Sequence, residues 1–127
     1  MSRVFQPQPD LERRVLAAVL CSPTALRIAA DLEVDDFQVA PHRWTFTAIR
    51  NLEAAKAPIG PVEVFTWLDT MDTRLGTFRS HTVTILWLGL LVVETQPYGA
   101  LREVFEADLR HLRIIATSIR AAHTRAA

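Results

Sequence analysis

Residues 36–52, DFQVAPHRWTFTAIRNL, indicate most clearly which class of fold this chain adopts. Pro41 suits the first turn of a helix, because its fixed φ and its missing N–H group match that position. After it, large apolar side chains recur at helical rather than alternating spacing. They are Trp44, Phe46, Ile49 and Leu52. We predict a helix from Pro41 to Lys56, preceded by a tight turn at residues 34–37 whose aspartates bond nearby backbone amides.

Prolines and helical spacing divide the rest of the chain in the same way. They predict five more helices, at residues 10–21, 24–32, 61–71, 81–94 and from 98 to about 122. Asp10 is expected to cap the first and Thr24 the second, since side-chain oxygens accept hydrogen bonds from unpaired N–H groups. The prediction is an all-α single compact domain of about six helices, with a long C-terminal helix. Its parts are an extended lead-in at residues 1–9, the helical domain at 10–122 and a C-terminal tail at 123–127.

The most apolar stretch is residues 83–93, which is apolar at every position except Thr84 and Gly89. Its 11 residues are too few for a membrane-spanning helix, which needs about 20. A helix that is apolar nearly all round is expected at the centre of the core, although its β-branched residues leave a strand as the alternative. The side chains predicted to be largely buried are Phe37, Phe46, Ile49, Phe65, Leu86 and Leu90.

The last predicted helix carries a heptad-like apolar stripe that is broken by Asp108. The second half of this stripe extends past any obvious partner within the chain. Because exposed aliphatic side chains are costly, we expect a second copy to cover it and the protein to be a homodimer. The alternative is that this end folds back on its own domain or frays. The candidate interaction residues are Leu112, Ile115, Ile119 and Ala122.

The charge balance gives no indication of nucleic-acid binding. Fourteen basic side chains stand against fourteen acidic ones, so there is no overall positive field to attract phosphates, and no direct binding to nucleic acid is expected. The arginines of the last helix are interpreted as complementing the negative helix C-terminus, with a phosphate-contacting patch as the alternative. The first ten residues contain two prolines and no long apolar run, so a secretory signal is not predicted and we expect a cytoplasmic protein without a membrane segment.

No catalytic, cofactor-binding or metal-binding pattern is present in the sequence. None of the four glycines precedes a lysine, so a phosphate-binding P-loop is excluded. The four histidines lack the i, i+4 spacing that places two metal ligands on one helix face, and Cys21 is the single cysteine. Cys21 is expected to be a small buried apolar residue. We therefore predict no metal, no cofactor and no enzymatic activity.

The order of several short motifs resembles the N-terminal domain of DnaB-type replicative helicases. The resemblance covers roughly residues 9–115 and is carried by four groups of landmarks. These are Pro9-Asp10-Leu11-Glu12 with Val15-Leu16 and Val19-Leu20 before Ser22-Pro23; Asp36-Phe37 with Pro41-His42-Arg43, Phe46, Ala48-Ile49 and Leu52; Pro58-Ile59 with Val62 and Leu68; and Tyr98 with Val104 and Leu109-Arg110. Two departures are a missing Gly-Gly before the fifth helix and a sequence that ends soon after the sixth. The family continues from there into a second hairpin helix, a linker and an ATPase domain.

The resemblance implies a domain that associates with copies of itself in a helicase collar and docks a primase or a loader. It also implies structural roles for five landmark residues: Phe37, Phe46 and Ile49 in the core, and His42 and Arg43 at a helix start. The expected function is a non-catalytic protein–protein interaction domain of the DNA replication machinery, with a replicative helicase, primase or loader as partner. The alternatives are a small helical DNA-binding or regulatory module and an unrelated helical scaffold.

Overall fold

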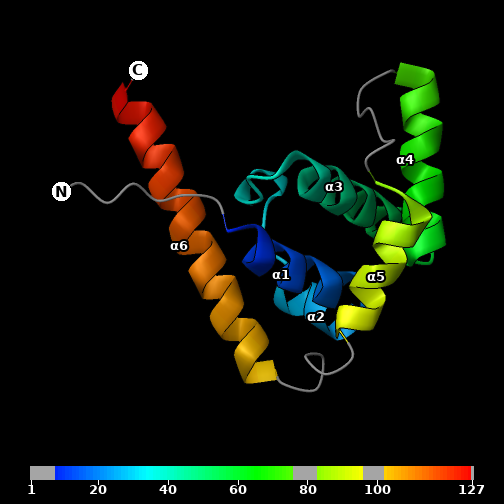
Figure 1. Ribbon diagram of the computed structural model, residues 1–127, viewed down its shortest axis with the longest axis horizontal. Coiled ribbons are helices and arrows are strands. Elements are labelled where there is room, and N and C mark those ends of the chain that lie inside the picture. Colours follow the sequence, from blue (N-terminus) through cyan, green and yellow to red (C-terminus); the bar gives the residue numbers. More distant parts are fainter. Residues whose placement is uncertain (1–7, 76–82, 96–101, 127) are drawn as a thin grey trace.

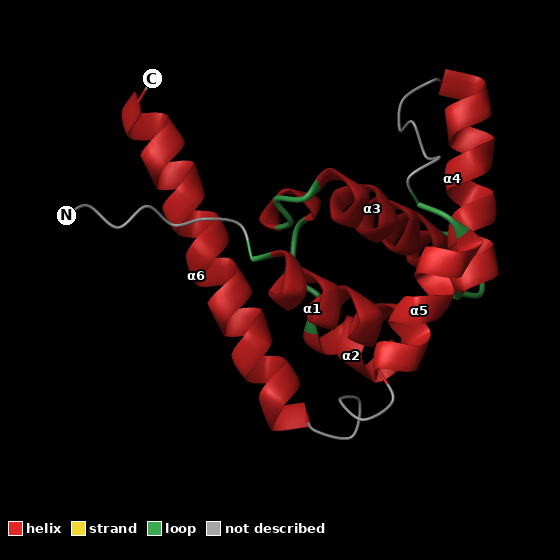
Figure 2. Cartoon of the chain, in the orientation of Figure 1, coloured by secondary structure: helices red, strands yellow, loops and turns green. Residues whose placement is uncertain are grey.

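The computed structural model describes residues 8–75, 83–95 and 102–126, and every regular element in them is helical (Figure 2). The elements are α1 (Pro9–Cys21), α2 (Pro23–Ile28), the 3-10 turn η1 (Val34–Asp36), α3 (Ala40–Ala54), α4 (Pro61–Leu75), α5 (Ile85–Thr95) and α6 (Arg102–Ala126). The all-α prediction is confirmed. The strand considered for residues 83–93 is wrong, because α5 occupies nearly all of that stretch.

Proline marks the beginning of four helices. Pro9, Pro23 and Pro61 are the first residues of α1, α2 and α4, and Pro41 is the second residue of α3. The predicted caps differ from the observed ones. Asp10 lies inside the first turn of α1, and Ser22 rather than Thr24 caps α2, where its hydroxyl oxygen accepts from the Ala25 N–H at 3.2 Å.

The central helix is α1, which packs against α2, α3, α5 and α6 (Figure 1). All six residues from Val15 to Leu20 are buried, and so is Leu11 at the other end of the helix. The prediction that residues 83–93 form the central helix is therefore wrong. Helices α1 and α5 are both apolar, but α1 packs against four other helices, whereas α5 packs mainly against α1 and α4.

Helix α5 buries one face and exposes the other. Leu88 and Leu91 are fully buried where α5 packs against α1 and α4, whereas Leu86 is 76% and Leu90 49% exposed. The expected burial of Leu86 and Leu90 is wrong, and Phe65 of α4 is only partly buried. A helix that is apolar all round carries no polar side to mark its outer face, so the sequence pattern could not select the buried one.

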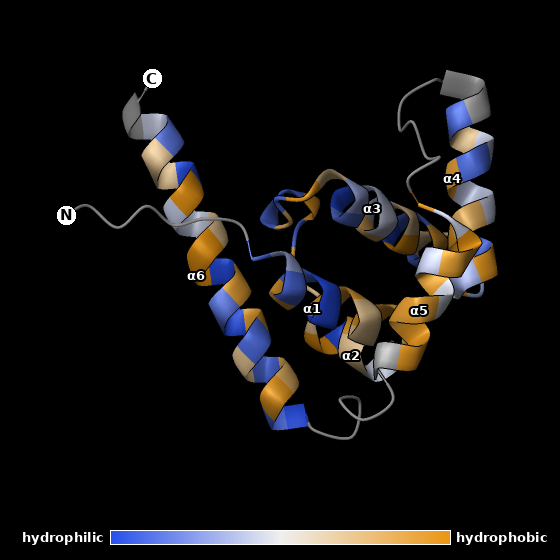
Figure 3. Ribbon diagram, in the orientation of Figure 1, coloured by the Kyte–Doolittle hydropathy of each residue, from blue (hydrophilic) through white to orange (hydrophobic). Residues whose placement is uncertain are grey.

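Helix α6 lies along one side of the molecule and packs against α1 and η1 (Figure 1). Apolar residues recur along α6 (Figure 3), and three of them are covered within the chain: Leu112, Ile115 and Ile119 have exposures of 1%, 4% and 9%. The expectation that these three side chains lack an intrachain partner is wrong, because α6 folds back on its own domain. Ala122 is exposed, and the helix continues through residues 123–126, where a tail was expected.

Cys21 is exposed, so its predicted burial is wrong. The apolar residues before it are buried, but Cys21 is the last residue of α1 and lies outside the packed part of the helix. Within the described residues, no helix has both the length and the apolar character that crossing a bilayer requires.

Candidate functional site

The landmark residues around the start of α3 form a packed and hydrogen-bonded unit. Phe37, Phe46 and Ile49 are fully buried, and the rings of Phe37 and Phe46 lie 5.0 Å apart at a tilt of 42°. The Arg50 guanidinium lies over the Phe46 ring, 4.7 Å from its centroid. The contact between these two rings packs α3 against the segment that precedes it.

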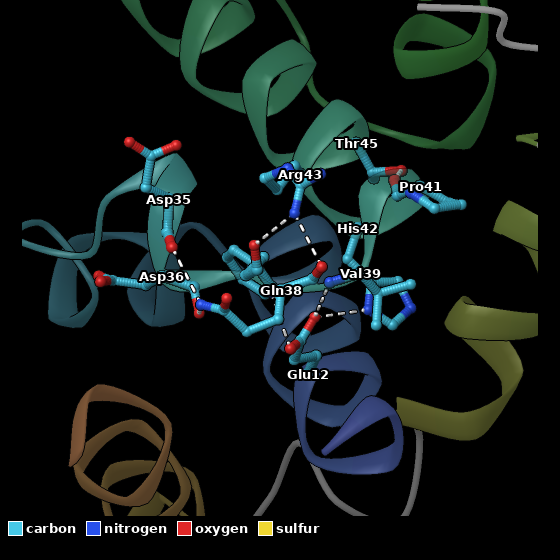
Figure 4. A network of polar contacts seen from close by, with 10 residues as sticks. Glu12, Asp35, Asp36, Gln38, Val39, Pro41, His42, Arg43 and Thr45 are labelled. Carbon is cyan, nitrogen blue, oxygen red and sulfur yellow. Dashed lines mark hydrogen bonds and ion pairs between the residues drawn. The ribbon is translucent and has the colours of Figure 1, made fainter. Parts of the chain in front are cut away.

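Glu12 of α1 connects the central helix to the start of α3 (Figure 4). Its carboxylate accepts from the backbone N–H of Gln38 at 2.9 Å and of Val39 at 3.2 Å, and it contacts His42 Nδ1 at 2.9 Å. Both side chains of the Glu12–His42 pair are buried, with exposures of 1% and 4%. Val39 is the N-cap residue of α3 and Gln38 precedes it, so this carboxylate, supplied by a different helix, accepts from N–H groups that have no partner inside α3.

His42 and Arg43 complete this unit. The His42 ring stacks on Trp87 of α5 at a centroid distance of 5.9 Å, while Arg43 donates to the carbonyl oxygens of Phe37 at 3.2 Å and Gln38 at 2.8 Å. His42 thus connects α1, α3 and α5. These contacts place both residues at the start of α3, where they join the helix to its neighbours.

Three ion pairs hold α6 against the domain. Arg14 of α1 bonds Asp108 at 3.1 Å, Arg113 pairs with Asp31, and Arg120 pairs with Asp36. Asp108, the charged residue that interrupts the heptad-like stripe, is therefore the partner of an arginine on the central helix. Because Arg113 and Arg120 are engaged with acids of their own chain, the phosphate-contacting patch considered for α6 loses two of its arginines.

The exposed face of α5 is the candidate interaction surface. Four large aliphatic side chains lie on it, and we call them the α5 stripe: Ile85, Leu86, Leu90 and Val93, with exposures of 48%, 76%, 49% and 66%. Gly89 lies between them in sequence, and a Cβ added there would meet no atom within 4 Å. The missing side chain allows another backbone to approach α5 closely. Several large apolar side chains exposed on one helix are typical of a protein–protein contact.

The described residues contain no group of three or more histidine, cysteine, aspartate or glutamate side chains that could hold a metal ion. His42 is engaged with Glu12 and Trp87, and His81 lies outside the described residues. Sequence reasoning missed two features. The capping role of Glu12 was not predicted, although an acidic residue next to a buried apolar run could have indicated it. The α5 stripe was also missed, because the whole segment was expected to be buried.

Comparisons with known proteins agree with this architecture. Residues 6–81 match the family model described as the DnaB-like helicase N-terminal domain. No curated protein matches the chain. Among solved structures, the fold is similar to the crystal structure of the N-terminal domain of DnaB helicase from Mycobacterium tuberculosis. The TM-score is 0.75 at 24% sequence identity, over 94% of this chain and 81% of that chain.

Proposed function

The chain belongs to the DnaB-like helicase N-terminal domain family, and from this premise we propose that it is a non-catalytic interaction domain of the DNA replication machinery. It associates with a second copy through the α5 stripe, and the resulting dimer docks a replicative helicase, a primase or a loader. Family membership supports the association with a helicase. The observation that carries the interaction role is the exposure of four large aliphatic side chains on one helix face.

The apolar surface of the α5 stripe sets the free energy that a dimer can gain. Complete burial of a large aliphatic side chain contributes roughly 1.5–3 kcal/mol, so covering the exposed part of each stripe residue contributes about 1–2 kcal/mol. A two-fold contact covers the same four residues on both copies. The gross gain of about 8–16 kcal/mol compares with an association cost of about 4–15 kcal/mol. A dimer that forms at micromolar concentration needs a net gain of about 8 kcal/mol, which the upper part of this range reaches against the lower association costs.

The proposed contact differs from the one expected from the sequence. Leu112, Ile115 and Ile119 are buried in their own chain and cannot reach a second copy without opening the domain. The α5 stripe is accessible without any rearrangement, and Gly89 allows two α5 helices to cross closely. We therefore place the self-association surface on α5 rather than on α6.

Sedimentation equilibrium tests the proposal. We expect the parent chain to exceed its monomer mass of 14.3 kDa at micromolar concentration, and Leu86→Asp/Leu90→Asp to sediment as a monomer with unchanged helicity. The matched control is Val104→Asp/Ile114→Asp, which alters two exposed aliphatics of α6 with exposures of 42% and 57%. It should behave as the parent. A monomeric parent, or a control that also dissociates, would contradict self-association through α5.

A binding experiment tests the docking role. A purified replicative helicase or primase domain should bind the parent at ordinary salt, as measured by biolayer interferometry with the immobilised chain. A salt-sensitive shift of short DNA without binding to either protein would instead support the DNA-binding module. The test separates the two functions because phosphate contacts weaken steeply as salt concentration rises.

A further inference from the structure

A second surface lies at the opposite end of α1 from Glu12. The end of α1, helix α2 and the segment after α3 enclose a groove of about 380 Å³. Its apolar lining includes Leu20, Leu26 and Ile59, and its polar rim carries Arg27, Glu53 and Lys56. This volume is at the lower end of the range for ligand pockets, which suits one or two side chains of a peptide rather than a large cofactor.

Lys56 occupies a backbone position that favours glycine. It follows α3 with a φ of 56°, in the left-handed region. The Lys56 N–H donates to the Glu53 carbonyl oxygen at 3.0 Å and the Ala57 N–H to that of Leu52 at 2.9 Å. These two bonds define a Schellman motif, in which glycine is the usual residue at the left-handed position. Lys56 is also the only lysine of the chain. Because glycine adopts this backbone conformation at lower energetic cost, the Lys56 side chain is a candidate for a role of its own.

The charges on the rim are positive in sum. Glu53 is engaged by Arg50, whose Nη1 lies 2.9 Å from Glu53 Oε1. Arg27 is exposed and donates to the Thr24 hydroxyl at 3.2 Å, a neutral partner. Near the end of α3, the carbonyl groups of Asn51, Leu52 and Glu53 accept backbone N–H groups, as does that of Ala18 in α1. The groove therefore presents two cations whose charge is not neutralised by an ion pair with a described residue.

We propose that this groove binds an acidic peptide segment of a partner protein. An aliphatic side chain of the segment enters between Leu20, Leu26 and Ile59, and flanking carboxylates pair with Arg27 and Lys56. The apolar lining provides affinity and the two cations provide selectivity for acidic over neutral sequences. This contact uses none of the α5 stripe residues, so the two surfaces can be occupied independently.

The probes are three short peptides with blocked ends: Gly-Asp-Leu-Leu-Asp-Gly, its Asn-for-Asp counterpart, and its Ser-for-Leu counterpart. Each is titrated into the ¹⁵N-labelled full chain at low ionic strength, and amide shifts are followed by NMR. We expect saturable shifts around residues 20–27 and 53–59 with the acidic leucine peptide. The affinity of the amide counterpart should be about fivefold lower, which is the effect expected of two partly exposed ion pairs. The serine counterpart should not saturate.

Variants at Lys56 separate a binding role from a structural one. Lys56→Gly relieves the left-handed backbone and should match or exceed the melting temperature of the parent, yet bind the acidic peptide about threefold more weakly. Lys56→Arg should retain parent affinity. Leu86→Asp/Leu90→Asp should bind the peptide as the parent does, even where it abolishes self-association. Equal affinity for acidic and neutral peptides, unchanged binding by Lys56→Gly, or shifts centred on α5 would each overturn the proposal.

Discussion

Removal of the Glu12 carboxylate provides the sharpest test of how the domain is held together. In Glu12→Ala, the backbone N–H groups of Gln38 and Val39 and the His42 ring lose a common buried acceptor. Each unsatisfied buried donor costs roughly 1–3 kcal/mol, and relaxation recovers part of the sum. We therefore expect a loss of about 3–5 kcal/mol, a large fraction of the 5–15 kcal/mol that typically stabilises a domain of this kind.

The assay is urea unfolding followed by far-UV circular dichroism. Glu12→Gln retains one carbonyl oxygen but loses the charge, so its cost should be smaller, at about 1–2 kcal/mol. The matched control is Glu53→Gln, which alters a glutamate that is 40% exposed in its pair with Arg50 and should cost less than about 1 kcal/mol. Amide hydrogen exchange provides a local measurement, because the Gln38 and Val39 amides should lose protection first in Glu12→Ala. A cost below about 1 kcal/mol for Glu12→Ala, with both amides still protected, would refute the capping role.

Three further predictions concern the core, α6 and catalysis. Phe46→Ala removes a fully buried ring and should lower the free energy of unfolding by about 3–5 kcal/mol in the same urea assay; a cost near zero would mean that the ring is not part of the core. Ile115→Asp places an unpaired charge in the contact between α6 and the domain, so it should cost about 4 kcal/mol or more and reduce helicity, whereas a stable helical variant would show that α6 does not fold back. Isothermal titration calorimetry with ATP and magnesium should show no specific heat, and saturable micromolar binding would contradict the predicted absence of a nucleotide site.

Much of the fold is encoded in short-range features of the chain. Pro9, Pro23, Pro41 and Pro61 each lie in the first turn of a helix, where their restricted φ and missing N–H group carry no penalty. The helical spacing of Phe46 and Ile49 marks the buried face of α3 before any other element is considered. These features depend only on residues within a few positions of one another.

Helix α5 shows that sequence periodicity alone cannot always predict which face of a helix is buried. Its sequence is apolar on every side, so periodicity could predict a helix but could not distinguish Leu88 and Leu91, which are buried, from Leu86 and Leu90, which are exposed. Which side chains of α5 are buried depends on the positions of α1 and α4, against which α5 packs. The candidate interaction surface therefore became visible only when the helices were assembled.

Neighbouring residues and the order of motifs were enough to predict the all-helical class, most helix positions and the family resemblance. The central place of α1, the return of α6 to its own domain and the contact of Glu12 with the start of α3 depend instead on how the helices pack. The partners of Glu12 lie 26 to 30 residues away, and those of Arg113 and Arg120 lie 82 and 84 residues away. No local propensity encodes such contacts, since they form only when packing of the apolar helix faces brings distant charges together.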